Sequence, residues 1–425
     1  MGTPASILFD TTQVEDSIAL LNALALRIHR VDFQVRLWDG TVWGATHDPV
    51  FTLVLHHSGA LRQILESPSE LSLGEAYISN DFDIEGDIIA AMELGDSLTQ
   101  SDFGIGEKLQ LLSLLRKLPS TKHNVQSARL FGSRHTPQRD RQAIAYHYNL
   151  PGEFYSLFLD ERLVYSCAYF HAASDDLETA QVQKLDYICR KLRLRPNDRL
   201  LDIGCGWGAL VLYAAKHYGV QAFGITLSAP QAEIASQRIA AAGLADCCRV
   251  KVCDYRELEQ RERFNKIVSV GMFEHVGEKL LSEYFSRAFC LLQPGGVFLN
   301  HGIAYNANFK RKGESFVDRY VFPDGELVPL NVTAHAAEEA GFEIRDVESL
   351  REHYVITLRH WVRRLEAHHK EAATLTNETT YRIWRLYMAG SSHAFDTGRL
   401  NLYQVLMAKP EGGKAYLPLT RGDWY

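Results

Sequence analysis

Apolar and polar residues alternate with different periods in the N-terminal and C-terminal parts of the 425-residue chain. The N-terminal elements predicted from this pattern are a helix over 15–30, a hairpin over 33–44, a strand over 51–57 and a short helix over 58–67. Asp39-Gly40 is a strong signal for the hairpin turn. The pattern predicts a small α+β domain over residues 1–105, in which the acids of residues 71–88 line solvated turns rather than bind a metal.

Residues 106–142 are leucine-rich at first and polar afterwards, which predicts an amphipathic helix over 107–118 and a linker over 120–141. Between residues 108 and 142 Asp140 is the only acid, and the eight basic residues are Lys108, Arg116, Lys117, Lys122, Arg129, Arg134, Arg139 and Arg141. A basic amphipathic helix can lie on anionic lipid. The alternative is a helix docked between two domains with a solvated polar face.

From residue 143 onward the pattern alternates between strands and helices. The predicted strands cover 199–204, 220–226, 248–254, 264–271 and 296–304, and the helices between them cover 209–219, 229–243 and 278–292. This order predicts an α/β fold with a doubly wound parallel sheet over residues 143–425. After residue 341 the order changes to a strand over 342–350, two helices and a strand over 400–410.

Composition narrows the classes of function. The net charge of −7 argues against bulk nucleic-acid binding. No stretch approaches the roughly 20 apolar residues of a membrane span, and the first residues lack the pattern of a signal peptide. Seven cysteines without a CxxC pair fit a reducing cytoplasm and predict no zinc site.

The strongest local motif is the glycine loop of residues 200–210, in which Gly204, Gly206 and Gly208 follow an apolar strand. Such a loop lets a ligand approach the backbone at the carboxyl end of a strand, although a tight turn alone is the structural alternative. A nicotinamide oxidoreductase is a weaker interpretation, since it favours GxGxxG spacing and an acid after the second strand. The polar residues there are Thr226, Ser228 and Gln231.

The GxGxG spacing instead resembles the loop of S-adenosylmethionine (SAM) dependent methyltransferases. Asp254, at the end of the third strand, could accept a hydrogen bond from an adenine amino group, and Tyr255 could pack on the ring. The alternative for Asp254 is a helix cap.

Longer strings make the resemblance more specific. Residues 146–170, 268–277, 299–304, 320–329 and 353–361 together resemble the cyclopropane-fatty-acyl-phospholipid synthases and their mycolic-acid relatives. The resemblance is dense over residues 143–410 and weaker over the N-terminal domain. It implies a Rossmann-like class I methyltransferase domain with a small N-terminal lipid-handling domain.

The family moves a methyl group from SAM to a cis double bond of a phospholipid acyl chain, and loss of a methyl proton then closes a three-membered ring. Aromatic faces can stabilise the intervening carbocation, and water must be excluded. The aromatic candidates are Tyr165, Tyr169, Phe170, Phe273 and Tyr320.

In this family a bound bicarbonate ion takes the proton. The resemblance implies that its ligands here are Cys167, Glu274, His301, Tyr354 and the backbone of Ile303. Histidine and tyrosine are donors that suit an oxyanion. We interpret Glu274 as the acceptor of the bicarbonate O–H, which would raise the basicity of the ion.

For SAM, the resemblance implies that Tyr165 and Ser166 lie beside the methionine end. It places Gly204, Gly206 and Gly208 under the cofactor, with Thr226, Ser228 and Gln231 at the ribose, in place of the missing acid.

One position departs from the family pattern, because Ser391 stands where many members have a cysteine. The bicarbonate mechanism needs no cysteine there, so we expect an active enzyme, peripherally bound to the inner face of the membrane. The family also allows a homodimer. Three alternatives stay open: a fatty-acyl C-methyltransferase that makes methyl-branched, methylene or hydroxylated chains, a non-catalytic lipid or SAM binder, and a soluble small-molecule methyltransferase.

Overall fold

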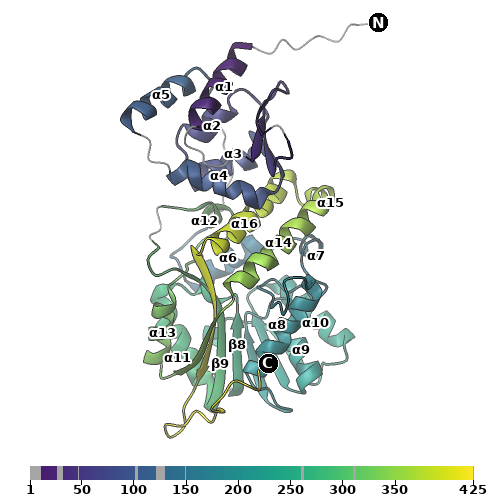
Figure 1. Ribbon diagram of the computed structural model, residues 1–425. Helices are drawn as coiled ribbons and strands as arrows, with labels where there is room; N and C mark the ends of the chain where they lie inside the picture. Colours follow the sequence, from purple (N-terminus) through teal and green to yellow (C-terminus); the bar gives the residue numbers. More distant parts are fainter. Residues whose placement is uncertain are drawn as a thin grey trace. The chain divides into compact units, whose positions relative to one another are not determined.

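The computed structural model describes residues 11–25, 32–45, 47–100, 104–120, 130–148, 150–259, 263–309 and 313–424. The chain forms two compact units, each assembled from separate segments (Figure 1). Unit 1 combines Met1–Ser127, Gly313–Tyr320 and Asn377–His393, and unit 2 combines Ala128–Lys312, Val321–Thr376 and Ala394–Tyr425. The domains predicted from the sequence, 1–105 and 143–425, do not coincide with these units. They place Gly313–Tyr320 and Asn377–His393, which belong to unit 1, in the C-terminal domain.

Unit 2 contains a seven-stranded sheet in the order β10-β11-β9-β8-β5-β6-β7. The strands are β5 (Arg199–Ile203), β6 (Gln221–Thr226), β7 (Cys248–Val252), β8 (Phe264–Val270), β9 (Leu292–Tyr305), β10 (Glu343–Ser349) and β11 (Leu400–Ala408). Strands β5 to β9 run parallel, as the alternation of strands and helices predicts. Strand β11 is antiparallel to both β9 and β10, so the complete sheet is mixed.

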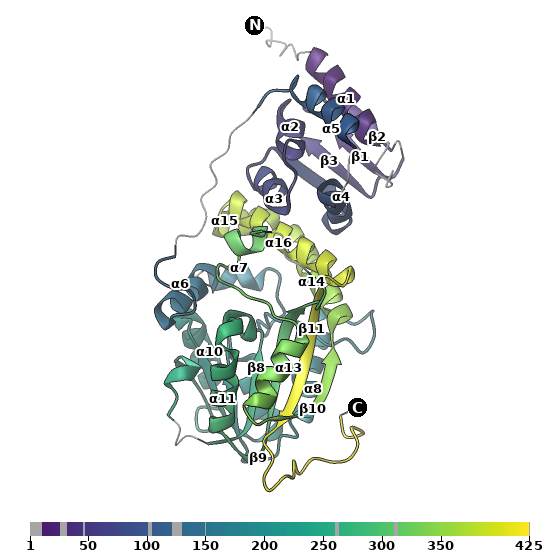
Figure 2. The same ribbon diagram turned by 90° about the vertical axis from the view of Figure 1, so that its left-hand side faces the viewer.

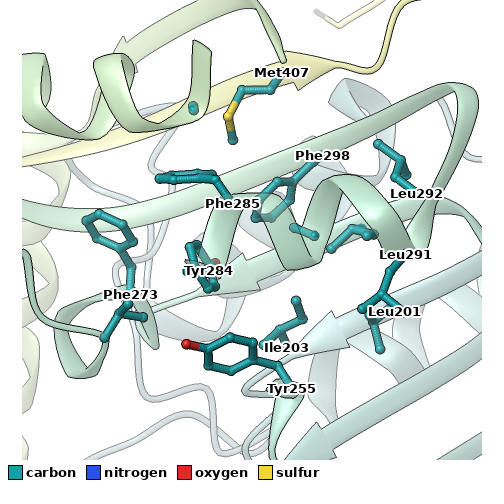
Figure 3. Close-up of a cluster of buried hydrophobic side chains, with 14 of the residues drawn as sticks. Leu201, Ile203, Tyr255, Phe273, Tyr284, Phe285, Leu291, Leu292, Phe298 and Met407 are labelled. Atoms are coloured by element: carbon teal, nitrogen blue, oxygen red, sulfur yellow. The ribbon is translucent and has the colours of Figure 1, made fainter. Parts of the chain in front are cut away.

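Helices cover both faces of this sheet (Figure 1, Figure 2). One face carries α8 (Leu177–Lys191), α9 (Ala209–Tyr218) and α10 (Ala229–Ala241), and the other carries α11 (Leu281–Leu291) and α13 (Leu330–Glu339). Alternate residues of β5 point to opposite faces, so Leu200 packs in the first core while Leu201 and Ile203 pack in the second. Figure 3 shows part of the second core, where Phe285 of α11 lies against Phe298 of β9, with ring centroids 6.3 Å apart.

The sequence-based prediction of the remaining helices after residue 120 was wrong at two places, and one of them involves α16 (Glu378–Asp396), most of which belongs to unit 1. The predicted linker over 120–141 contains the start of α6 (Pro137–Tyr148), because Thr136 accepts the amide of Asp140 and proline suits a first helical turn. Residues 121–129, with Lys122 and Arg129, lie outside the described part. Three helices rather than two follow β10, namely α14 (Arg351–Ala367), α15 (His369–Leu375) and α16. Unit 2 also holds α7 (Gly152–Ser156).

Unit 1 contains a four-stranded sheet in the order β2-β1-β3-β4. Its strands are β1 (Phe33–Arg36), β2 (Val42–Gly44), β3 (Phe51–Leu55) and β4 (Phe82–Gly86), and its helices before residue 120 are α1 (Thr11–Ala25), α2 (Ala60–Leu65), α3 (Glu70–Ile78), α4 (Ile88–Gln100) and α5 (Ile105–Leu115). The hairpin of β1 and β2 turns at Asp39-Gly40, as predicted. The turns expected over 71–88 are mostly helix and strand, because Ser69 forms a capping box that starts α3.

The segment 377–393 fills the interior of unit 1. Arg382 of α16 donates to the Tyr77 carbonyl at 2.8 Å and pairs with Asp83 at 2.8 Å, and the Arg385 guanidinium donates to the Tyr77 hydroxyl at 2.8 Å. Both arginines are buried. Unit 1 also includes α12 (Phe316–Tyr320). Because a buried cation needs partners, these contacts fix the late segment to the early sheet.

The glycine loop between β5 and α9 is shaped by two close contacts. A Cβ on Gly204 (φ +87°) would lie 2.7 Å from Met272 Cβ, and one on Gly208 (φ +82°) would lie 3.0 Å from Ala235 Cβ. A Cβ on Gly206 (φ +52°) would meet nothing within 4 Å. The outer glycines therefore allow close packing, whereas the central one borders open space.

These contacts predict unequal costs of alanine substitution. Gly206→Ala should lower the free energy of unfolding by about 1 kcal/mol, the cost of a left-handed residue. Gly204→Ala should lower it by about 2–4 kcal/mol, because overpacking against Met272 adds to the same backbone cost. Denaturant unfolding of both variants measures the difference, and equal losses would contradict the packing role of Gly204.

Candidate active site

A pocket in unit 2 lies at the carboxyl ends of β5, β6, β7 and β8. This is where ligands bind in open α/β sheets. The predicted cofactor residues that line it are Tyr165, Ser166, Gly204, Gly206, Thr226, Gln231, Asp254 and Tyr255. Helix α6 contributes Asp140, Ile144 and Tyr148 to the same lining.

Gly208 and Ser228 do not line the pocket but hold helices in place. Gly208 allows the close approach of α10, and the Ser228 hydroxyl caps α10 by accepting the Gln231 amide at 3.4 Å. The Thr226 hydroxyl donates to Gln231 Oε1 at 2.9 Å. The three polar residues after β6 thus support one another, and Thr226 and Gln231 face the pocket.

Asp254 takes the cap geometry that sequence analysis left as its alternative. Its carboxylate accepts the Arg256 amide at 2.9 Å and pairs with the Arg256 guanidinium at 2.6 Å. The same guanidinium reaches Asp140 of α6 at 2.8 Å and so ties α6 to the pocket rim. The role of Asp254 at an adenine amino group stays a prediction, as does stacking by Tyr255.

Two buried charged residues beside the glycine loop escaped sequence analysis. Lys184 Nζ donates to Ser166 Oγ at 2.9 Å, and burial lowers the pKa of Lys184 to about 8. Burial raises the pKa of Asp202 to about 7, against the opposing effect of Lys184. Both residues line the pocket. A signal existed in the sequence, because Gln181 and Lys184 interrupt the apolar stripe of α8.

Glu274 and Ile303 are in direct contact. The pairing of β8 with β9 ends at Val270 and His301, and the next β9 amide facing this edge, that of Ile303, donates to Glu274 Oε1 at 2.8 Å. Glu274 thus takes the place of a further residue of β8. Burial raises the pKa of its carboxyl from an ordinary value of 4.5 to about 7. Its Oε2 is buried and has no partner among the described residues.

This contact changes the interpretation of Ile303. Sequence analysis assigned its backbone to a bound anion, whereas in the structure its amide holds Glu274. A buried carboxylate without a donor would be costly. In the structure Ile303 thus positions Glu274, and contact of its backbone with a bound anion stays a prediction.

His301 lies two residues before Ile303 on β9, facing Gln404 of β11 in the ladder. Its Nδ1 is 3.2 Å from Gln404 Nε2, and its Nε2 is buried with no partner among the described residues. Burial, helped by Lys184 and Lys191, lowers the pKa of His301 well below its usual range. The imidazole is therefore neutral near pH 7.

Cys167 and Tyr354 join this group through Leu350. The Leu350 carbonyl lies 3.8 Å from the Cys167 sulfur and accepts the Tyr354 amide at 3.1 Å. The Leu350 amide donates to Leu402, which stands opposite Ile303 in the β9–β11 ladder. Burial raises the pKa of the Cys167 thiol, so the thiol stays neutral.

The five predicted base-site residues therefore belong to one chain of contacts near the end of β9. None of these five residues lines the pocket described above. Two residues adjacent to them in sequence do line it: Ser166, which precedes Cys167, and His275, which follows Glu274. Lys184, which lines the pocket, also affects the pKa of both Cys167 and His301.

The predicted aromatic residues have different surroundings. Tyr165 lines the pocket, and its hydroxyl lies 3.2 Å from His147 Nε2. The other four are engaged elsewhere: Tyr169 stacks on Tyr187, Phe170 on His353, Phe273 packs in the second core, and Tyr320 of unit 1 donates to Glu75. Ser391, the departure from the family pattern, lies half-buried on the unit 1 part of α16.

The described residues hold neither a helix suited to span a membrane nor a side-chain cluster suited to a metal ion. Among them, no helix is both long and apolar enough to cross a membrane. No group of three or more His, Cys, Asp and Glu side chains in the same part of the chain is arranged to hold a metal ion.

Curated relatives cover most of the chain. A "Probable fatty acid methyltransferase" of Pseudomonas putida is 41% identical and matches 94% of this chain and 98% of its own length. A "Probable fatty acid methyltransferase" of Mycobacterium tuberculosis is 36% identical over 90% of this chain and 92% of its own length. The Escherichia coli "Cyclopropane-fatty-acyl-phospholipid synthase" is 37% identical over 62% of this chain and 66% of its own.

Solved structures match the catalytic part. The cyclopropane synthase MmaA2 of Mycobacterium tuberculosis has a TM-score of 0.61 and 31% identity, with 63% of this chain and 97% of that chain covered. The mycolic acid cyclopropane synthase CmaA1 "complexed with SAH and CTAB" has a TM-score of 0.60 and 33% identity, with the same coverage. These matches confirm the predicted α/β methyltransferase fold.

Family models divide the chain in two. Residues 20–102 match a model described only as "Domain of unknown function". Residues 135–405 match the model "Mycolic acid cyclopropane synthetase". The chain therefore belongs to the mycolic acid cyclopropane synthetase family of SAM-dependent methyltransferases acting on fatty acids.

Proposed function

We propose that the protein is a cyclopropane fatty acid synthase that acts on the cis double bond of unsaturated phospholipid acyl chains, with bicarbonate as the base. The observation that carries the proposal is the pair of buried, unpartnered atoms Glu274 Oε2 and His301 Nε2, since Glu274 is held by Ile303, two residues from His301 on β9. Buried polar atoms in native proteins normally have partners. A small polar ligand between them would supply the missing contacts.

The residues of the SAM pocket fit an amino-acid cofactor with a nucleoside. SAM supplies the methyl group as a sulfonium electrophile. Lys184 would face the carboxylate of its methionine part and Asp202 the ammonium, while Gly206 leaves the backbone open to it. Tyr165 would offer an aromatic face to positive charge in the same pocket.

The chemistry needs a dry site and a base more than a strong nucleophile. The alkene forms a C–C bond as the C–S bond breaks, and positive charge remains on the second alkene carbon. A new C–C bond then closes the ring as one methyl C–H bond breaks and the proton leaves. Water would trap the cation as an alcohol, so the buried surroundings of the site favour ring closure.

The residues present fit bicarbonate by their chemistry. Bicarbonate supplies an oxygen base of moderate strength. His301, with its depressed pKa, and the Cys167 thiol, with its raised pKa, do not supply one, and the Glu274 carboxyl is held by the amide of Ile303. His301 would donate to it, and Glu274 in its carboxylate form would accept its O–H. Tyr354 would be a further donor.

A second function is favoured by the names of two relatives. The Pseudomonas putida and Mycobacterium tuberculosis proteins are each named a probable fatty acid methyltransferase. The same cation gives a methylene-branched chain when the proton is lost after a hydride shift, and a methyl-branched chain would need a separate hydride donor to reduce it. The two functions share the methyl transfer and differ in how the cation is quenched.

The proposal predicts a specific lipid product. Incubation of the protein with SAM, bicarbonate and vesicles of a cis-unsaturated phospholipid should add one CH₂ to each modified acyl chain. Mass analysis detects the gain, and proton NMR distinguishes ring hydrogens from those of an exocyclic methylene. A product with an exocyclic methylene would favour the second function, and release of no S-adenosylhomocysteine would indicate a non-catalytic binder.

The burial of the Glu274 carboxyl predicts a pH-dependent stability. Its folded pKa of about 7 lies above the unfolded value near 4.5, so its contribution is fully present below pH 4.5 and is lost as pH rises through 7. The loss is at most about 3 kcal/mol. Glu274→Gln should remove this dependence, so the wild-type protein should weaken relative to the variant between pH 4.5 and 8. If the free energy of unfolding of the wild-type protein and of Glu274→Gln changed with pH by the same amount, the raised pKa of Glu274 would be contradicted.

We propose a membrane contact of α5, which the exposed face of this helix supports. Leu109 and Leu112 are exposed on this helix, at 64% and 39% of their full surface, and the exposed Lys108 and Arg116 flank them. Residues three and four apart share one helix face. Exposed leucines beside basic side chains suit the surface of an anionic bilayer, and we assign that role to α5.

Vesicle flotation measures this contact. Leu109→Ser combined with Leu112→Ser should lower binding to anionic phospholipid vesicles at least tenfold, because each buried leucine contributes about 1.5–3 kcal/mol. Leu419→Ser is the matched control, since Leu419 is fully exposed outside α5. Equal binding of the double variant and the control would contradict a lipid contact of α5.

A further inference from the structure

Lys191, Gln404 and His301 form a buried line of hydrogen bonds that joins α8 to β11 and β9. Lys191 Nζ donates to Gln404 Oε1 at 2.9 Å, and Gln404 Nε2 lies 3.2 Å from His301 Nδ1. All three side chains are at most 1% exposed. This arrangement sets the direction of each hydrogen bond.

The direction follows from what each group can donate. An ammonium has donors and no acceptor, so the Gln404 atom that faces Lys191 is the amide oxygen. The amide nitrogen then faces His301 and can only donate. Because His301 is neutral, its Nδ1 must accept this hydrogen bond and its ring proton must be on Nε2.

Lys191 is itself fixed. It forms an ion pair with Glu348 and lies 3.6 Å from Asp346, both on β10. Its Nζ is 4.6 Å from the ring centroid of Tyr187, whose hydroxyl donates to Glu348 at 2.9 Å. A buried ammonium held from several sides cannot turn away, so the Gln404 amide cannot flip without placing two donors together.

We propose that Lys191 and Gln404 are positioning residues that fix His301 as the Nε2–H tautomer, so that the unpartnered Nε2 presents a hydrogen-bond donor to an oxygen of the bound base. This inference rests on the proposed function for the identity of the acceptor. The tautomer itself follows from contacts within the chain.

The tautomer can be measured without lipid or SAM. Full-length protein labelled with ¹⁵N-histidine would be studied by long-range ¹H–¹⁵N NMR near neutral pH, with His301 signals identified by their loss in His301→Gln. The wild-type protein should show His301 protonated on Nε2 alone. Protonation on Nδ1, or an imidazolium, would overturn the proposal whatever the variants do.

Gln404→Glu reverses the hydrogen bond. One carboxylate oxygen would accept from Lys191 and the other from Nδ1–H, so the His301 proton should move to Nδ1. In the lipid assay kcat should fall at least tenfold, with the KM for SAM unchanged because Gln404 does not line the pocket. An unchanged tautomer, or a changed tautomer with full kcat, would overturn the positioning role.

Tyr284→Phe is the matched control. This variant removes a buried 2.9 Å hydrogen bond from the Tyr284 hydroxyl to Asn300. Asn300 precedes His301 on β9, so the two side chains point to opposite faces of the sheet. The His301 tautomer should stay on Nε2, and a shift there would overturn the specific role of Gln404. If the wild-type protein shows the Nε2–H tautomer yet makes no lipid product, the proposed function fails while the tautomer assignment stands.

Discussion

The antiparallel pairing of β11 with β9 is the constraint on which the candidate site depends. Its register sets His301 opposite Gln404 and Ile303 opposite Leu402. A shift of one residue would turn each side chain to the other face of the sheet. The cofactor pocket lies at the ends of the parallel strands β5 to β8, whereas the antiparallel strand β11 supplies the partner that orients His301.

Burial of charge gives the site its chemical character. A carboxyl with a pKa near 7, a neutral imidazole and a neutral thiol all arise because side chains are removed from water with few compensating charges. Burial also lowers the pKa of Lys191, and the ion pair with Glu348 offsets this desolvation in part. Perturbed groups of this kind concentrate at functional sites.

Local patterns were sufficient to predict much of the fold. The strand, glycine loop and helix around Gly206 were predicted because each depends on residues adjacent in sequence, and the Asp39-Gly40 hairpin was predicted for the same reason. The start of α6 was missed although Thr136 and Pro137 form a recognisable signal. Asp202 lies in the glycine-loop motif of residues 200–210, but its partner could not be predicted because Lys184 approaches it from α8, a separate element.

Contacts that depend on tertiary structure could not be predicted from spacing. The amide of Ile303 is available to Glu274 only because β8 stops pairing at Val270, a point that sequence does not reveal. The arginines of α16 illustrate the same limit on a larger scale: Arg385 and its partner Tyr77 are 308 positions apart. During synthesis on the ribosome, the early sheet must therefore wait for almost the whole polypeptide before its interior is complete, and a chain released early would leave Tyr77 and Asp83 without their cationic partners.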